Sequence, residues 1–390
     1  MKKILSLVLA LALVMSTLAV FTACGGDNGT ADMKVAMVTD YGDITDQSFN
    51  QSTYEACKEW CEANEVDFKY FKPADNNTDA RVASVEQAIN EGYNVIVLPG
   101  YAFAGTIVKV QDDYPDVKFV ALDVAAGDIL SEAIGESYTW NPDDYDITKY
   151  LKSNVFCAVY QEELSGFMAG VFAVEQGYKH LGFLGGMAVP AVIRFGYGFV
   201  QGANYAAEQL GVDIKIEYAY GNQFYGDDVI TAYTDNWYQN LGVEVVFACG
   251  GGIYTSAAES AKKTGGKVIG VDVDQKAIID GLYGEGMTIT SAMKGLQPTV
   301  KLLLNAIADG KWDDYKGKIV NLGLVSGTDP EANYVQIPYN TTLWDADYTQ
   351  EDYKALVKAM FDGTVTVSPD VTKEPTVGSR TTVNYLGNIK

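Results

Sequence analysis

The sequence has one histidine, His180, among its 390 residues. It also has no Gly-x-Ser-x-Gly turn and no phosphate-binding loop of the Walker type. A hydrolytic triad needs a histidine as its base, and nucleotide hydrolysis needs the phosphate loop. Zinc sites require closely spaced Cys and His, and no such spacing occurs. We therefore predict no catalytic residues, no metal site and no cofactor.

Positive charge is scarce. The chain has 28 Lys and Arg against 51 Asp and Glu, which gives a formal net charge of −23. A surface of this charge repels phosphate backbones and anionic lipid headgroups. We therefore exclude nucleic acid as a partner.

Cysteine is also rare, with five residues in all. Four of them (Cys57, Cys61, Cys157 and Cys249) lie on apolar faces of expected helices or strands. Such residues are usually buried free thiols, and a disulfide framework is improbable in so long a chain.

The only long hydrophobic run, from Ile4 to about Val20, follows Lys2 and Lys3 and precedes Ala23-Cys24-Gly25-Gly26. This arrangement resembles a bacterial lipoprotein signal, in which the cysteine becomes the lipid-modified first residue. We predict a signal peptide over residues 1–23, lipidation of Cys24, a flexible tether over 24–32, and a position on the extracytoplasmic face of the cell membrane. A plain anchor helix is the alternative.

Beyond the tether, strand-like runs alternate with helical ones, which is the pattern of an α/β fold with parallel sheets. The expected strands are Val35–Val38, Val66–Phe71, Val95–Leu98, Phe119–Leu122, Leu181–Leu184, Ile214–Tyr218, Val245–Ala248 and Val268–Val271. The expected helices include Arg81–Asn90, Leu164–Glu175, Gly198–Leu210 and Ser256–Lys263. Residues 137–154 are expected to be a loop insertion, and the tail from Thr364 a final strand or two with coil.

The two halves of the chain look duplicated. Val95–Leu98 is followed by Pro99-Gly100 and leads to a strand that ends at Asp123, and Val245–Ala248 leads through Gly250 to Asp272 in the same way. We therefore predict two similar lobes, each with an aspartate at the carboxyl end of a strand, where open α/β sheets bind ligands.

A polar segment, Asp40–Asn50, joins the first strand to the first helix. Asn50 and Tyr54 are four residues apart and so share one side of that helix. An amide beneath an aromatic ring suits a flat polar heterocycle. The alternative is that Asp46 is only a helix cap and that Tyr54 only packs.

The second half offers further candidates. Gly251 lies in a glycine turn that lets the backbone approach a ligand, and Lys294 follows a strand-like run. Asp272-Val273-Asp274 could hold a metal and a nucleotide-sugar, but Asp274 is better placed as a helix cap. Lys294 and Arg194 could equally be solvated surface charges.

Several motifs together resemble the basic membrane protein family of ABC-transporter substrate-binding lipoproteins, and most closely its purine-nucleoside-binding members. They run in the family's order from about residue 33 to 367. The motifs are Asp46-Gln47-Ser48-Phe49-Asn50-Gln51-Ser52, Glu162-Glu163-Leu164-Ser165-Gly166-Phe167-Met168-Ala169-Gly170, Gly185-Gly186-Met187, Val192-Ile193-Arg194-Phe195 with Gly198-Phe199, Gly270-Val271-Asp272-Val273-Asp274-Gln275, and Thr290-Ser291-Ala292-Met293-Lys294.

The resemblance implies an α/β fold of the type I periplasmic-binding-protein class, with two Rossmann-like lobes and a ligand cleft between them. We expect residues 33–155 and about 280–325 in the N-terminal lobe, and 156–279 and about 326–390 in the C-terminal lobe. By resemblance, the ligand-binding residues divide between base and sugar. Asp46 and Asn50 would bind the base, Tyr54 and either Phe195 or Phe224 would stack on it, and Asp272, Lys294 and Asp123 would hold the sugar hydroxyls.

The expected function is delivery of a purine nucleoside (inosine, guanosine or adenosine) to the permease subunits of an ABC importer, without chemistry. Three alternatives stay open. The ligand could be another flat molecule such as a flavin, the protein could be an exported nucleoside-processing enzyme, or it could be a sensor or adhesin without a transport partner.

Overall fold

The structure, a computed structural model, describes residues 29–390. The predicted signal peptide and Cys24 lie outside the described residues, as does most of the predicted tether. The described chain forms two compact units. Unit 1 contains the residues up to Thr45, Phe49–Val159 and Leu296–Leu322; unit 2 contains Asp46–Ser48, Tyr160–Gly295 and Gly323–Lys390.

These boundaries differ from the expected ones chiefly at residues 280–295, which we placed in the N-terminal lobe and which belong to unit 2. The reason is strand pairing, because β10 (Thr288–Lys294) runs parallel to β9 (Lys267–Asp272). Residues 156–159, at the end of β5, belong to unit 1, and 323–325 belong to unit 2.

Unit 1 is built on a six-stranded sheet in the order β11-β5-β4-β3-β1-β2. Its strands are β1 (Lys34–Val38), β2 (Asp67–Phe71), β3 (Val95–Pro99), β4 (Lys118–Leu122), β5 (Val155–Tyr160) and β11 (Lys318–Leu322). Its helices are α2 (Phe49–Ala63), α3 (Thr78–Asn90), α4 (Ala104–Val110), α5 (Ala126–Ile134) and α11 (Leu296–Ala308). On one face α3, α4 and α5 cover an apolar core. Elsewhere in the unit, Trp60 of α2 donates a hydrogen bond to Asn305 of α11 at 2.7 Å.

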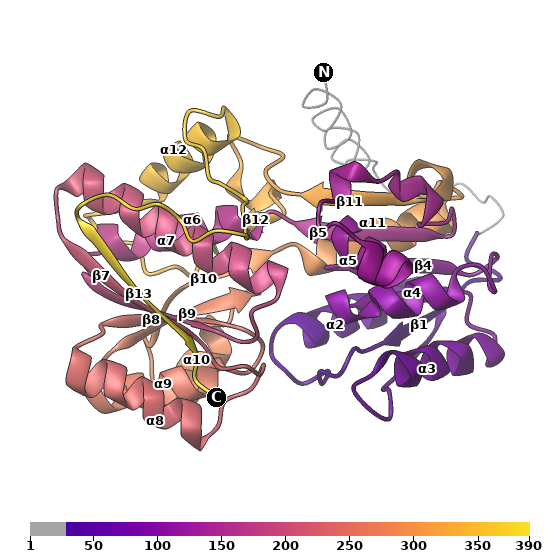
Figure 1. Ribbon diagram of the computed structural model, residues 1–390, viewed down its shortest axis with the longest axis horizontal. Coiled ribbons are helices and arrows are strands. Elements are labelled where there is room, and N and C mark those ends of the chain that lie inside the picture. Colours follow the sequence, from indigo (N-terminus) through magenta and orange to yellow (C-terminus); the bar gives the residue numbers. More distant parts are fainter. Residues whose placement is uncertain (1–28) are drawn as a thin grey trace. The chain divides into compact units, whose positions relative to one another are not determined.

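Unit 2 is built on a seven-stranded sheet in the order β12-β10-β9-β8-β6-β7-β13. Its further strands are β6 (His180–Gly185), β7 (Ile214–Tyr220), β8 (Val245–Cys249), β12 (Val335–Gln336) and β13 (Thr381–Asn388). Its helices are α6 (Glu162–Glu175), α7 (Pro190–Leu210), α8 (Asp228–Asn236), α9 (Tyr254–Thr264), α10 (Lys276–Tyr283) and α12 (Gln350–Phe361). Helices α6, α7 and α12 cover one face of this sheet, and α8, α9 and α10 cover the other (Figure 1).

The predicted strands and helices are confirmed, and so is the duplication. Within each unit the first five strands in chain order follow the same parallel arrangement, with the first strand between the second and the third. Asp123 follows the fourth strand of unit 1, and Asp272 ends the fourth strand of unit 2. This is the doubly wound topology in which ligands bind beyond the carboxyl ends of the strands.

Helices α6 and α7 pack backbone against backbone. A Cβ atom added to Gly166 or Gly170 of α6 would overlap backbone atoms of α7, and one added to Gly198 or Gly202 of α7 would overlap carbonyl groups of α6. Glycine at these four positions therefore sets a very short helix–helix distance. The two helices form a rigid support for any side chain that they carry.

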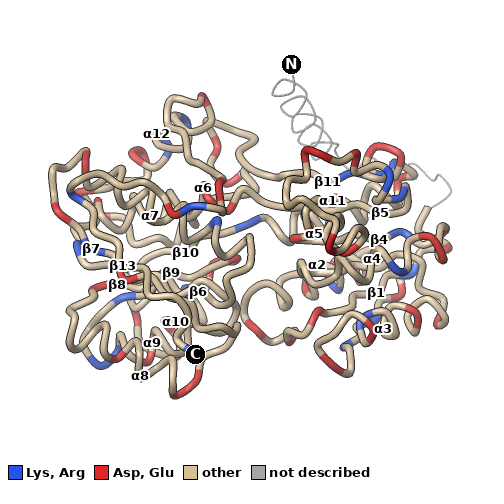
Figure 2. The backbone as a smooth tube through the Cα atoms, viewed as in Figure 1, with Lys and Arg blue, Asp and Glu red and all other residues tan. Residues whose placement is uncertain are grey.

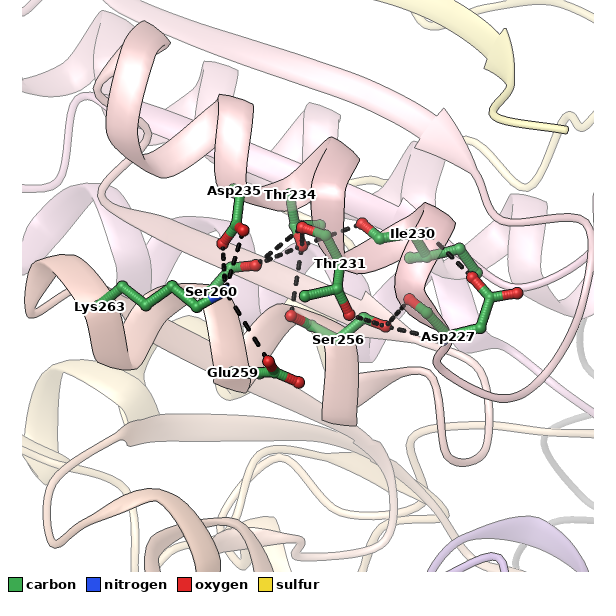
Figure 3. A network of polar contacts seen from close by, with 9 residues as sticks. All are labelled: Asp227, Ile230, Thr231, Thr234, Asp235, Ser256, Glu259, Ser260 and Lys263. Carbon is green, nitrogen blue, oxygen red and sulfur yellow. Dashed lines mark hydrogen bonds and ion pairs between the residues drawn. The ribbon is translucent and has the colours of Figure 1, made fainter.

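Helices α8 and α9 are joined by a polar network (Figure 3). Thr234 shares a hydrogen bond with Ser260 at 2.8 Å, Thr231 donates to Ser256 at 2.9 Å, and Lys263 pairs with Asp235 at 2.9 Å. These groups satisfy one another, so we interpret the network as a connection between helices.

The tail ends as expected in a strand. β13 runs parallel to the edge strand β7 (Figure 1), and Asn384 donates to the buried carboxylate of Glu217 at 3.2 and 3.1 Å. The segment 137–154, expected to be a loop insertion, contains short 3₁₀ turns. The four described cysteines are buried and free, as predicted. Within residues 29–390, no helix combines the length and apolar character needed to cross a bilayer.

Candidate functional site

Asp272 has an unusual backbone conformation at the end of β9. Its φ angle is +66°, and the Val273 amide donates to the Val271 carbonyl at 2.7 Å, so the aspartate lies at the centre of a tight turn. Asp123, its counterpart in unit 1, has a φ of +61°. Residues other than glycine adopt such angles at a cost in free energy, and they concentrate at functional sites. Both the backbone geometry and the position in the sequence therefore make the duplicated aspartates candidate ligand-binding residues.

A chain of ion pairs leads from Asp272 into the interior of unit 2. The Lys294 ammonium lies 3.6 Å from a carboxylate oxygen of Asp272 and 3.4 Å from Oε1 of Glu162. Oε2 of Glu162 accepts a hydrogen bond from Nε of Arg194 at 2.6 Å. The Glu162 side chain is fully buried, and 3% of the Lys294 side chain is exposed. Two carboxylates and two cations thus alternate in a nearly dry environment, where charges interact strongly.

Two aromatic rings also lie near the ammonium of Lys294. It lies 5.6 Å from the ring centroids of both Tyr160 and Phe195. Phe195 is only 1% exposed and packs edge-to-face on Phe247. Phe195 is therefore part of the core beneath the charged cluster.

The buried side-chain amide of Gln275 forms hydrogen bonds at the same end of the sheet. Its Oε1 accepts from the Val271 amide at 2.9 Å, and its Nε2 donates to the Gly251 carbonyl at 3.5 Å and the Gln47 carbonyl at 3.0 Å. Ser48 donates to Asp272 at 2.6 Å. A hydroxyl–carboxylate bond of this kind is what a ligand hydroxyl would make at Asp272.

The remaining candidates of unit 2 lie close to these residues. Gly251 has a φ of +52°, and the amide of Gly252 donates to the Phe224 carbonyl at 2.9 Å. Phe224 is partly exposed. Asp46 accepts from the Ser48 amide at 2.9 Å and so shapes the turn before α2, and its role toward a ligand stays a prediction.

In unit 1, Asn50 is buried and lies against Gly42. Tyr54 is partly exposed and packs on Phe68 and Tyr70, with centroid distances of 5.6 and 6.0 Å. Tyr54 therefore packs against other side chains of unit 1, and its ligand-binding role stays a prediction.

Sequence reasoning misses three residues of this site, namely Glu162, Ser48 and Gln275. All three lie inside the quoted family motifs, which are the only sequence signal for them. Arg194, for which the sequence leaves a surface charge open, is paired with Glu162. Asp274 accepts from the Lys276 amide at 3.1 Å and from Thr341 at 2.6 Å, but the expected cap role is wrong by one position, because the N-cap of α10 is Gln275. No metal-type cluster of His, Cys, Asp or Glu occurs in the described part of the chain.

Next to Glu162, Glu163 is 2% exposed, and its Oε2 has no hydrogen-bond partner among residues 29–390. Burial, supported by the negative charge of Glu162, raises the pKa of Glu163 to about 7.

Over the rest of the molecule, acidic groups are spread across both units (Figure 2).

Comparison with known proteins gives a family match over residues 33–358, to the family described as "ABC transporter substrate-binding protein PnrA-like". The ABC transporter nucleoside-binding protein BmpA of Lactococcus lactis is 27% identical over 81% of this chain and 88% of its own length. Basic membrane protein B of Borreliella afzelii is 27% identical over 82% of this chain and 86% of its own. An uncharacterized lipoprotein of Pyrococcus abyssi is 25% identical over 75% of this chain and 67% of its own.

Solved structures agree on the fold. An ABC transporter solute-binding protein from Conexibacter woesei superposes with a TM-score of 0.63 at 19% identity, covering 86% of this chain and 99% of that one. A solute-binding protein from Aeropyrum pernix gives 0.62 at 19% identity, covering 86% and 87%. The predicted type I periplasmic-binding-protein fold is thereby confirmed.

Proposed function

Because the chain belongs to the PnrA-like family of ABC transporter substrate-binding proteins, we propose that it binds purine nucleosides outside the cell and delivers them to an ABC permease. The observation that carries the proposal is the Asp272–Lys294 pair at the carboxyl end of the unit 2 sheet, with Asp272 in a strained turn. A carboxylate beside an ammonium offers both an acceptor and donors to a ribose hydroxyl. The name of the Lactococcus relative supports a nucleoside as the ligand.

In this proposal Asp272 and Lys294 hold the sugar hydroxyls, together with Asp123. Asp46 and Asn50 bind the base. Tyr54 stacks on one face of the base, and Gly251 lets the backbone approach.

For the opposing aromatic we choose Phe224, because it is partly exposed and lies beside Gly251. Phe195 is buried beneath Lys294 and is better placed to fix the position of the ammonium.

We further propose that Cys24 carries a lipid that holds the protein on the extracytoplasmic face of the membrane. The Ala23-Cys24-Gly25 sequence supports this assignment, as does the lipoprotein name of the Pyrococcus relative. Positioned in this way, the protein would stay close to a permease in the same membrane.

The test is identification of the bound molecule. Mass spectrometry of ligand released from freshly purified protein should find a purine nucleoside, and calorimetry should then give its affinity beside that of riboflavin. If riboflavin binds more tightly than the nucleoside, the proposed ligand is a flavin and not a nucleoside. Release of free base from inosine at ordinary enzyme rates, of order 1 per second or more, would instead identify a nucleoside-processing enzyme.

A further inference from the structure

One buried carboxylate pairs with both cations of the candidate site. Glu162 accepts from Arg194 at 2.6 Å through Oε2 and contacts the Lys294 ammonium at 3.4 Å through Oε1. The three side chains come from α6, α7 and β10, so each is fixed by a different element. Their exposed fractions are 0% for Glu162, 16% for Arg194 and 3% for Lys294.

These pairs bear on which ligands the site accepts. Arginine and lysine are the usual partners of phosphate groups, and here two of them meet within one cluster. The low number of Lys and Arg in the whole sequence therefore does not by itself make this site unable to bind phosphate. In the folded protein the positive charges are balanced by Glu162 and Asp272, and a phosphate would have to compete with two carboxylates in a low-dielectric environment.

We propose that Glu162 is a specificity-determining residue, which makes the site reject phosphorylated ligands by pairing with Lys294 and Arg194. The inference rests on the proposed function, since it assigns the choice between nucleosides and nucleotides to one residue of the same site. Without the Glu162 charge, the site around Lys294 and Arg194 would be more positive by one unit charge. An anion could then bind between the two cations in place of the lost carboxylate.

The chain offers a matched control in the adjacent residue. Glu163 is buried to a similar degree in the same helical turn, but it forms no ion pair with Lys294 or Arg194 among the described residues. Burial raises the pKa of its carboxyl group to about 7. Below that pH the group is largely uncharged, so Glu163→Gln alters the chemistry without altering the charge.

The experiment compares wild type, Glu162→Gln, Glu162→Asp and Glu163→Gln at a pH below the pKa of Glu163. Calorimetry measures the affinities for inosine, inosine 5′-monophosphate and inorganic phosphate. We expect Glu162→Gln to raise the affinity for the monophosphate relative to inosine by about tenfold or more, the value of one charge-assisted hydrogen bond. It should also bind inorganic phosphate. Glu162→Asp and Glu163→Gln should keep the wild-type ratio.

Loss of a buried ion-pair partner can impair folding, so the melting temperature of each variant is also followed as phosphate is added. A ligand that binds only the folded state stabilises it, and phosphate should therefore raise the melting temperature of Glu162→Gln and leave that of Glu163→Gln unchanged. A Glu162→Gln protein that stays unfolded at high phosphate would overturn the proposal. So would an unchanged ratio of monophosphate to inosine affinity, or the same gain in Glu163→Gln.

The two hypotheses fail in different ways. If wild type binds no nucleoside but Glu162→Gln gains phosphate binding, the proposed ligand is wrong and the role of Glu162 stands. If wild type binds inosine and Glu162→Gln shows no gain for phosphate or the monophosphate, the proposed function stands and the role of Glu162 is wrong.

Discussion

Replacing Glu163 by glutamine should stabilise the protein at alkaline pH and leave it nearly unchanged in acid. The residue is 2% exposed at the start of α6, and in the part of the chain that the structure describes its Oε2 has no hydrogen-bond partner. Burial, with a smaller contribution from Glu162, raises the pKa of the carboxyl group from 4.5 to about 7. Glutamine has nearly the same shape and carries no charge at any pH.

The sign and size follow from proton linkage. Between pH 4.5 and about 7 the folded protein holds a proton on Glu163, whereas the unfolded chain has lost it. The free energy of unfolding therefore falls as pH rises through this range. The difference between the two pKa values corresponds to up to about 3 kcal/mol, because one pKa unit is worth about 1.4 kcal/mol. Glu163→Gln should regain this amount at pH values above the folded pKa.

Urea unfolding of wild type and Glu163→Gln over a pH series measures the effect. Other carboxylates titrate in both proteins, so the informative quantity is the difference in unfolding free energy at each pH. Glu62→Gln is the control, because that side chain is 68% exposed in an i,i+4 pair with Lys58 and should change stability by less than about 1 kcal/mol throughout. A difference between wild type and Glu163→Gln that does not vary with pH would refute the reasoning.

Four further predictions follow from the same structure. Asp272→Ala should weaken nucleoside binding by about ten- to a hundredfold, the value of a charge-assisted hydrogen bond; a marked fall in melting temperature with unchanged affinity would make Asp272 structural. Gly202→Ala should lower the free energy of unfolding by about 1–3 kcal/mol, because the added methyl group overpacks the contact of α7 with α6. Gly281→Ala is the control: the space around Gly281 is open, so this change should leave the free energy of unfolding unchanged or raise it. Although burial opposes it, hydrogen bonds from Lys215, Asn384 and His180 lower the pKa of Glu217. Glu217→Gln should therefore lower the free energy of unfolding at neutral pH, and this difference from wild type should shrink as the pH falls below the ordinary pKa of glutamate. Cys24→Ser should release the protein from the membrane fraction, as seen by fractionation and immunoblotting.

Local sequence patterns were enough to predict most of the fold. Apolar runs such as Val95–Leu98 and Val245–Ala248 are strands because both faces of a parallel strand are covered by helices. The repeated aspartates, Asp123 and Asp272, were recognisable because each follows such a run, and both proved to have the same left-handed backbone conformation. A pattern over neighbouring residues suffices where the physical cause is itself local.

Only the tertiary structure decided which charges meet. Glu162 and Lys294 are 132 positions apart, and nothing in their neighbouring residues indicates that they form a pair. Strand pairing likewise placed residues 280–295 in unit 2, since the register of β10 on β9 depends on the whole sheet. The sequence by itself determined the alternation of helices and strands and the aspartates at their ends. The ion pairs around Lys294 depend on three elements brought together by folding, because electrostatic interactions act through space rather than along the chain.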